Sequence, residues 1–194
     1  MTDHFALLEL PRSPWLEPAE VKAHFAKLSG PVHPDRVHQA DDVTRADANR
    51  RYADLNAAQQ CLIDTRLRLR HLVELESGEP PSDVGQVPQG ISELFFKVGQ
   101  ALRVADQLLK EKEAASSPMV RAQLAQRIVE PVDQLQRLQA ELQQRRGELD
   151  ERCRALTRGW SAERVPAAAG LQRDYSYLDR WLGQVLEKSL QLTL

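Results

Sequence analysis

Cysteine is scarce in this sequence, and its scarcity excludes a disulfide-stabilised secreted domain. The 194 residues include two cysteines, Cys61 and Cys153, which lie far apart and form no CxxC pair. Small secreted domains carry several cysteines at close spacings instead. We therefore expect two reduced thiols in a cytoplasmic protein.

Aromatic residues are few, and neither sign of charge is in large excess. Aromatic side chains make up 5% of the chain, which favours helices packed through leucine and alanine over a strand-rich core. Lysine and arginine number 26 against 28 aspartates and glutamates, so the net charge is −2. A nucleic-acid-binding protein would usually be basic, and we expect no nucleic-acid partner.

Several motifs that would indicate a membrane protein, a metalloprotein or an enzyme are absent as well. No apolar run is long enough to cross a bilayer, and the N-terminal residues lack the pattern of a signal peptide. The histidines show no metal-ligand spacing, and there is no glycine-rich phosphate loop or GxSxG motif. We expect no membrane association, metal, cofactor or catalytic residues.

The chain divides into three regions by composition. Residues 76–90 hold three prolines and three glycines with almost nothing apolar, which is typical of a linker. Residues 1–75 and 91–194 both show helical periodicity. The sequence therefore predicts two helical domains, 1–75 and 91–194, joined by a linker at 76–90.

Apolar spacing predicts four helices in the first domain and three in the second. The first four cover residues 5–10, 18–29, 43–63 and about 67–75, with Pro18 suited to a first helical turn and Gly30-Pro31 ending the second helix. The later three cover 91–112, 119–156 and 171–192, and their apolar stripes predict an antiparallel three-helix bundle. Pro131 predicts a kink in the middle stretch or two helices end to end. The near-heptad pattern of that stretch leaves an intermolecular coiled coil open.

A polar tripeptide, His33-Pro34-Asp35, lies between the second and third predicted helices. Pro34 fixes its own φ and biases His33 toward extended backbone, so the loop has a defined shape. Asp35 offers a carboxylate that an arginine of a partner could bind through two hydrogen bonds. Positive charge from Lys22, Lys27 and Arg36 would steer an acidic partner surface. The alternatives are that His33 and Asp35 only cap a loop and that the lysines form a solvated helix face.

Four further segments accompany the tripeptide: Phe5-Ala-Leu-Leu-Glu-Leu-Pro11, Leu16-Glu-Pro-Ala-Glu-Val-Lys-Ala-His-Phe25, Leu55-Asn-Ala-Ala-Gln-Gln-Cys-Leu62 and Arg68-Leu-Arg-His-Leu-Val-Glu-Leu75. In these segments the chain resembles the J-domain family, and within it the HscB type of iron–sulfur co-chaperone. The resemblance implies an all-α fold, with a J domain (an antiparallel helical hairpin with flanking short helices) before the three-helix bundle. It also implies that His33, Pro34 and Asp35, assisted by Lys22, Lys27 and Arg36, contact a DnaK/HscA-type chaperone and stimulate its ATPase.

The same resemblance implies that the bundle binds a client, the IscU-type scaffold protein. Tyr177-Leu178-Asp179 is similar to the family's client patch on the last helix, and Leu94-Phe95-Phe96-Lys97-Val98 to that on the first bundle helix. The expected client-binding residues are Leu94, Phe95, Phe96, Val98, Tyr177 and Leu178. Phe95 and Phe96 point about 100° apart on a helix, so we expect one in the core and one exposed. The family's acidic Leu-Arg-Glu-Glu continuation is replaced here by Leu102-Arg103-Val104-Ala105.

Two other hypotheses remain open from the sequence. The J domain could serve a different client, or the bundle could be a self-associating module. The chain could also be a purely structural helical protein whose tripeptide is accidental. Stimulation of a partner ATPase separates the last hypothesis from the others.

Overall fold

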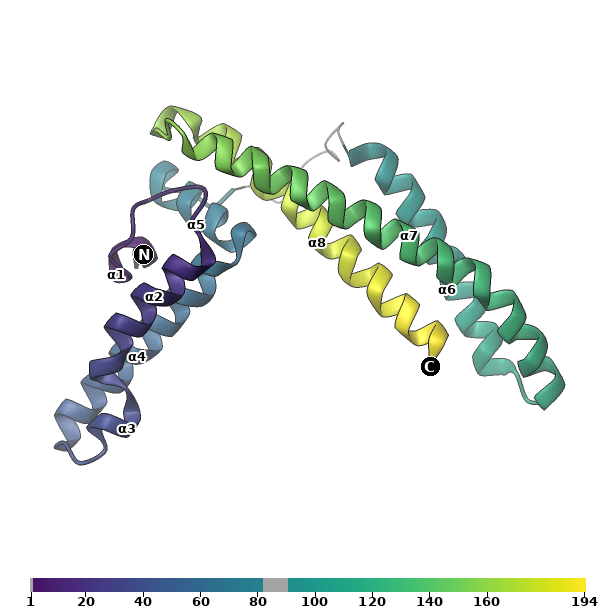
Figure 1. The fold of residues 1–194 in the computed structure, drawn as a ribbon, viewed down its shortest axis with the longest axis horizontal. Helices are drawn as coiled ribbons and strands as arrows, with labels where there is room; N and C mark the ends of the chain where they lie inside the picture. Colours follow the sequence, from purple (N-terminus) through teal and green to yellow (C-terminus); the bar gives the residue numbers. More distant parts are fainter. Residues whose placement is uncertain (1, 82–90) are drawn as a thin grey trace. The chain divides into compact units, whose positions relative to one another are not determined.

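The computed structural model describes residues 2–81 and 91–194, and within these ranges the chain contains helices and no strand (Figure 1). None of the described helices combines the length and the apolar character needed to cross a bilayer. The chain separates into two compact units. The first comprises Met1–Ser82 and Arg152–Gln172, and the second comprises Asp83–Glu151 and Arg173–Leu194.

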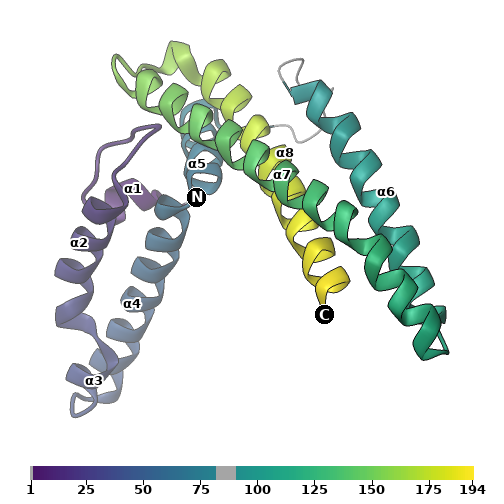
Figure 2. The same cartoon turned by 45° about the vertical axis from the view of Figure 1, so that its right-hand side comes forward.

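An antiparallel helical hairpin dominates the first unit. Its arms are α2 (Pro18–Ser29) and α4 (Asp42–Ile63), joined through the short helices η1 (Gly30–Val32) and α3 (Pro34–Val37) (Figure 2). The short α1 (His4–Leu7) precedes the hairpin, and α5 (Thr65–Ser77) follows it. Side chains set these boundaries: the Asp41 carboxylate accepts hydrogen bonds from Val43 N and Thr44 N, which caps α4. Gly78, at φ 81°, ends α5 in the left-handed conformation that glycine adopts without strain.

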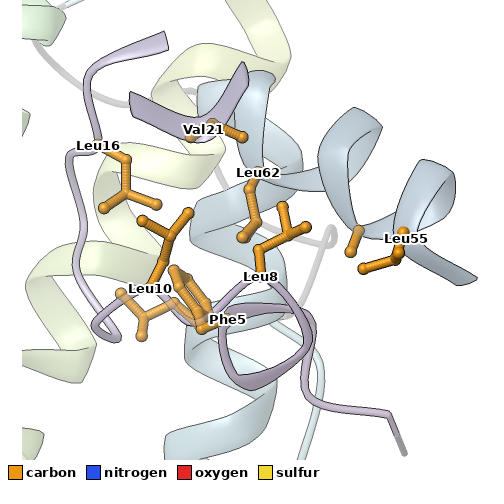
Figure 3. Packing of buried hydrophobic residues seen from close by; sticks show 9 residues of the cluster. Phe5, Leu8, Leu10, Leu16, Val21, Leu55 and Leu62 are labelled. Carbon is orange, nitrogen blue, oxygen red and sulfur yellow. The ribbon is translucent and has the colours of Figure 1, made fainter. Parts of the chain in front are cut away.

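The core of the first unit lies between α1, α2, α4 and α5. Figure 3 shows its buried apolar side chains, which come from the residues before the hairpin, from both hairpin arms and from α5: Phe5, Leu8, Leu10, Leu16, Val21, Leu55, Ala58, Leu62 and Leu72. Complete burial of one such side chain contributes about 1.5–3 kcal/mol. Because α1 packs on α4, the short first helix closes one end of the hairpin core.

Residues 11–17, here named the strap, run between α1 and α2 and are held by the buried Arg68 of α5. Arg68 is 1% exposed. Its Nε donates to Pro14 O at 2.9 Å, its Nη1 to Leu62 O at 2.6 Å and its Nη2 to Thr65 Oγ1 at 3.1 Å. One guanidinium therefore ties the strap to the junction of α4 and α5.

The strap is also bound by a segment from far along the chain. Trp15 N donates to Thr157 Oγ1 at 2.9 Å, and the Cys153 thiol donates to Pro14 O at 3.2 Å. The guanidinium of Arg154 lies 4.3 Å from the centroid of the Trp15 ring, a cation–π contact. Residues 152–172 thus belong to the first unit by their contacts.

Three helices contribute to the second unit: α6 (Ser92–Ala114), α7 (Pro118–Thr157) and α8 (Val165–Thr193), the last preceded by η3 (Ala162–Arg164). Contacts between α6 and α7 pair Lys97 with Glu141 and Glu111 with Arg127, so these helices are antiparallel. Between α7 and α8, Arg146 binds Asp179 and Asp150 accepts from Tyr175, which is again an antiparallel register. The predicted three-helix packing is therefore present.

The middle helix is continuous across its proline. Pro131 lies inside α7, so the alternative of two helices end to end is wrong. The apolar positions of its near-heptad pattern are buried within the chain: Leu124, Ile128, Leu135, Leu138, Leu142, Leu149 and Cys153. Those positions are therefore not available for an intermolecular coiled coil.

The structure describes only part of the predicted linker at 76–90, because residues 82–90 lie outside the described residues.

Candidate functional site: the hairpin tip and the aromatic row

The tripeptide His33-Pro34-Asp35 lies at the tip of the hairpin, where η1 turns into α3. His33 has φ −63° and ψ 134°, which is the extended backbone expected before a proline. Pro34 occupies the first turn of α3, where its missing N–H costs no hydrogen bond. The chain therefore passes the tip in a fixed turn rather than in an open loop.

The His33 side chain is held by two contacts of its own. Its Nδ1 accepts a hydrogen bond from Asp35 N at 3.3 Å, which caps α3. Its ring packs edge-on against Tyr52 of α4, with the two ring centroids 5.2 Å apart. Because Nδ1 accepts, the proton of the neutral ring lies on Nε2. The capping role considered from the sequence is thus present, and it leaves Nε2–H as the ring's remaining donor. Tyr52 was not anticipated as part of this site.

The Asp35 carboxylate faces solvent. Its side chain is 89% exposed, and Oδ2 lies 3.6 Å from His33 Nδ1. Arg36 beside it is exposed. On α2, Lys22 and Lys27 are exposed as well, and Lys27 Nζ forms a solvent-exposed ion pair with Glu9 at 3.1 Å. Such a pair contributes little to stability, so this basic face remains available for a partner.

A second candidate surface lies on α6 and α8, where four aromatic rings follow one another. Ring centroids are 5.6 Å apart for Phe96 and Phe95, 6.3 Å for Phe95 and Trp181, and 5.6 Å for Trp181 and Tyr177. We name Phe96, Phe95, Trp181 and Tyr177 the aromatic row. Phe96 is 72% exposed and Phe95 46%, whereas Trp181 is 5% exposed. Tyr177 is half-buried. The two phenylalanine rings at one end of the row are therefore exposed, and the indole between Phe95 and Tyr177 is buried.

Three residues expected in the client patch lie in the core instead. Leu94, Val98 and Leu178 are buried, because they lie on the stripes through which α6 and α8 pack together. They support the surface but do not reach it, which corrects their assignment as contact residues. The expectation that either Phe95 or Phe96 is a core residue is also wrong, since both are exposed. Trp181 was missed, although it lies four residues after Tyr177 and so on the same helix face.

Neither cysteine offers a reactive thiol. Burial raises the pKa of the Cys61 thiol to about 11, so this thiol stays protonated at neutral pH. Cys153 is buried and bonded to the strap. Across residues 2–81 and 91–194, no three metal-ligating side chains come together.

No family model matches the sequence. Two solved structures are similar to it in fold. The chaperone HscB from Vibrio cholerae superposes with a TM-score of 0.66 at 17% identity, covering 98% of this chain and 99% of that one. The human co-chaperone protein HscB superposes with a TM-score of 0.63 at 15% identity, covering 97% of this chain and 82% of that one. The predicted all-α fold, an antiparallel helical hairpin with flanking short helices followed by a helical bundle, is confirmed.

Proposed function

We propose that this protein is a J-domain co-chaperone of the HscB type. It stimulates ATP hydrolysis by a DnaK/HscA-type chaperone and delivers a client, the IscU-type scaffold on which iron–sulfur clusters are built. The observation that carries the proposal is the exposed His33-Pro34-Asp35 turn at the tip of the hairpin, in a fold shared with two HscB proteins.

The chemistry of the tip suits recognition of a cationic site on the chaperone. An exposed aspartate can accept two parallel hydrogen bonds from an arginine, which fixes orientation as well as charge. The Tyr52 contact and the cap to Asp35 N restrict the His33 ring, so little side-chain entropy is lost on binding. Hydrolysis takes place on the chaperone, and this chain acts by binding.

Two substitutions at His33 separate capping from partner contact. Glutamine removes the ring, and asparagine removes it while keeping a side-chain acceptor of the kind preferred at helix N-caps. We expect both His33→Gln and His33→Asn to abolish stimulation of the chaperone ATPase in a steady-state assay. We expect the asparagine variant to keep wild-type stability and the glutamine variant to lose no more than about 1 kcal/mol.

Asp35 offers a control matched in charge and exposure. Asp42, on the first turn of α4, is 90% exposed and pairs with Arg45. We expect Asp35→Asn to reduce stimulation and Asp42→Asn to leave it unchanged. Full stimulation by the folded His33→Asn protein would reduce His33 to a structural cap and remove the basis of the proposal.

The aromatic row is the proposed client surface. Exposed aromatic anchors beside a buried ring are typical of binding hot spots, where truncation often costs about 2 kcal/mol or more. Calorimetry of the full chain with an IscU-type scaffold tests this, with Phe95→Ala, Phe96→Ala and Tyr177→Ala expected to weaken binding. Met119→Ala is the control, because Met119 lies on α7 and is as exposed as Phe96. Equal affinity of all variants would place the client elsewhere.

A further inference from the structure

Arginine side chains flank the aromatic row on both helices. On α6, Arg103 follows Phe96 by seven residues, which is about two turns, so it lies on the same helix face. Arg103 is exposed, and its Nε donates to Gly99 O at 3.1 Å. The side chain thus folds back along α6 toward the two phenylalanines.

On α8, the second arginine lies directly against the row. The exposed Arg180 places its guanidinium carbon 5.9 Å from the centroid of the Tyr177 ring. Stacking on an aromatic face holds the guanidinium while leaving its N–H groups free to donate. Both ends of the aromatic row therefore carry a positioned positive charge.

The acidic neighbours of these arginines already have cationic partners. Asp106, three residues after Arg103, binds Lys188 at 2.8 Å, and Asp179, next to Arg180, binds Arg146 at 2.9 Å. In the part of the chain that the structure describes, neither Arg103 nor Arg180 pairs with a carboxylate. Two further carboxylates lie on the helix faces that bear the row: the exposed Glu93, one turn before Phe96, and the partly buried Asp174, one turn before Tyr177, which has an interaction of its own. Arg103 and Arg180 therefore remain available to a carboxylate of another molecule.

Gly99 leaves the space between the phenylalanines and Arg103 open. A Cβ built at Gly99 would meet no atom within 4 Å, so packing inside the protein does not require glycine here. Glycine inside a helix costs about 0.5–1 kcal/mol relative to alanine. A glycine without an internal packing reason, on the face that bears the row, permits close approach by another molecule.

From this arrangement we infer that the client presents an apolar surface rimmed by aspartate or glutamate side chains, which Arg103 and Arg180 bind. The inference rests on the proposed role of the aromatic row as the client surface. Arginine and aromatic residues together form the commonest hot spots, and a guanidinium binds a carboxylate through two hydrogen bonds. A client with a basic rim would meet like charge at both ends of the row and be rejected.

Two synthetic helical peptides test the charge preference with the full-length chain. Both carry the same leucine and phenylalanine face, flanked by glutamates in one peptide and by lysines in the other. We expect the glutamate peptide to bind at least about tenfold more tightly. The double variant Arg103→Glu, Arg180→Glu should lose this preference. Arg137→Glu is the control, because Arg137 is an exposed arginine of α7 outside the row.

The outcomes separate the inference from the proposed function. Equal affinities, a preference for lysine, or no binding of either peptide would overturn the inference. Binding of an IscU-type scaffold that depends on Phe96 but is unchanged by the double arginine variant would also overturn it, while leaving the proposed function intact. Failure of the scaffold to bind, with the glutamate preference present and arginine-dependent, would overturn the proposed client and uphold the inference.

Discussion

At Gly99, stability would favour alanine, whereas the inferred client contact would favour glycine. It lies inside α6 in a helical conformation with free space around it. Replacement by alanine lowers the entropy of the unfolded chain without creating a clash. We expect Gly99→Ala to raise the free energy of unfolding by about 0.5–1 kcal/mol in urea denaturation. The same variant should bind the client more weakly, and a destabilised Gly99→Ala protein would contradict the geometry described here.

His4, the first residue of α1, and His71 of α5 make the free energy of unfolding depend on pH. His71 Nε2 accepts from His4 N at 3.1 Å, and the two rings lie 4.5 Å apart. The pKa of both rings lies below the ordinary 6.5, mainly because the rings are partly buried. Nearby carboxylates raise the pKa, but by less: Asp3 acts on both rings, Asp54 on His4 and Glu74 on His71. In the unfolded chain both rings take up protons more readily.

The free energy of unfolding should therefore be highest above pH 6.5 and should fall as the pH drops below that value. Protonation of His71 also turns the acceptor for His4 N into a donor. We expect His71→Gln, which keeps an acceptor but does not titrate, to reduce this acid-side loss in urea denaturation at pH values above and below 6.5. An unchanged pH dependence in the variant would assign the effect to other groups, and His38→Gln serves as the exposed control.

At the residue level, the sequence located the hairpin tip but not the arrangement of the aromatic row. The tripeptide is local, and Pro34 restricts its backbone whatever the rest of the chain does. Phe95 and Phe96 could not be assigned in the same way, since both widen the apolar arc of α6. Which side of that arc is covered depends on where α8 packs. Trp181 completes the row only because α8 lies beside α6.

At the level of helices, the predicted segments agree closely with those observed, because each end carries its own signal. Pro18 begins α2 and Gly78 ends α5. The last helix begins earlier than predicted, at Val165. The first turns of α8 contain Pro166, three alanines and Gly170, which show no apolar stripe. Local periodicity therefore gave no sign of its start.

Arg68 joins three elements, and this requires the three nitrogen atoms of its planar guanidinium group. Three hydrogen bonds of its guanidinium run to the strap, to the end of α4 and to the first residue of α5. A lysine carries one nitrogen and cannot reach all three acceptors. We expect Arg68→Lys to lower the free energy of unfolding by about 2–3 kcal/mol. Arg70→Lys, an exposed arginine on the same helix, should change it little in the same urea titration.

The basic face of α2 should act mainly on the rate of association. Lys22 and Lys27 are exposed on α2, and Arg36 is exposed on α3, next to the tip. Charges at the rim of an interface mostly change the association rate and its salt dependence. We expect stopped-flow association with the chaperone to slow as salt is added, and Lys22→Ala, Arg36→Ala to weaken that dependence. A flat salt response of the wild type would indicate that this face is only solvated.

At the level of the whole molecule, the first unit is discontinuous in sequence. Thr157, Cys153 and Arg154 contact the strap, and Trp160 packs against the hairpin core. The contacts with the strap join residues more than 130 positions apart and leave no local pattern. Composition alone could therefore divide the chain only into 1–75 and 91–194.

A fragment of residues 1–81 should accordingly be less stable than the same residues in the full chain. It lacks the acceptor for Trp15 N and the ring of Trp160. We expect faster amide hydrogen exchange in α2 and α4 of the fragment, because local opening costs less free energy there. Full-length Thr157→Val should show part of the same effect. Equal protection in the fragment and the full chain would mean that residues 152–172 contribute nothing to the hairpin.

The discontinuity also sets an order of events during synthesis. The hairpin leaves the ribosome before residues 152–172, which pack on its strap, have been made. At a synthesis rate of about 5–20 residues per second, several seconds pass between the synthesis of the hairpin and that of residues 152–172. Throughout that interval the nascent chain displays the His33-Pro34-Asp35 tip on a hairpin whose strap is not yet covered by residues 152–172.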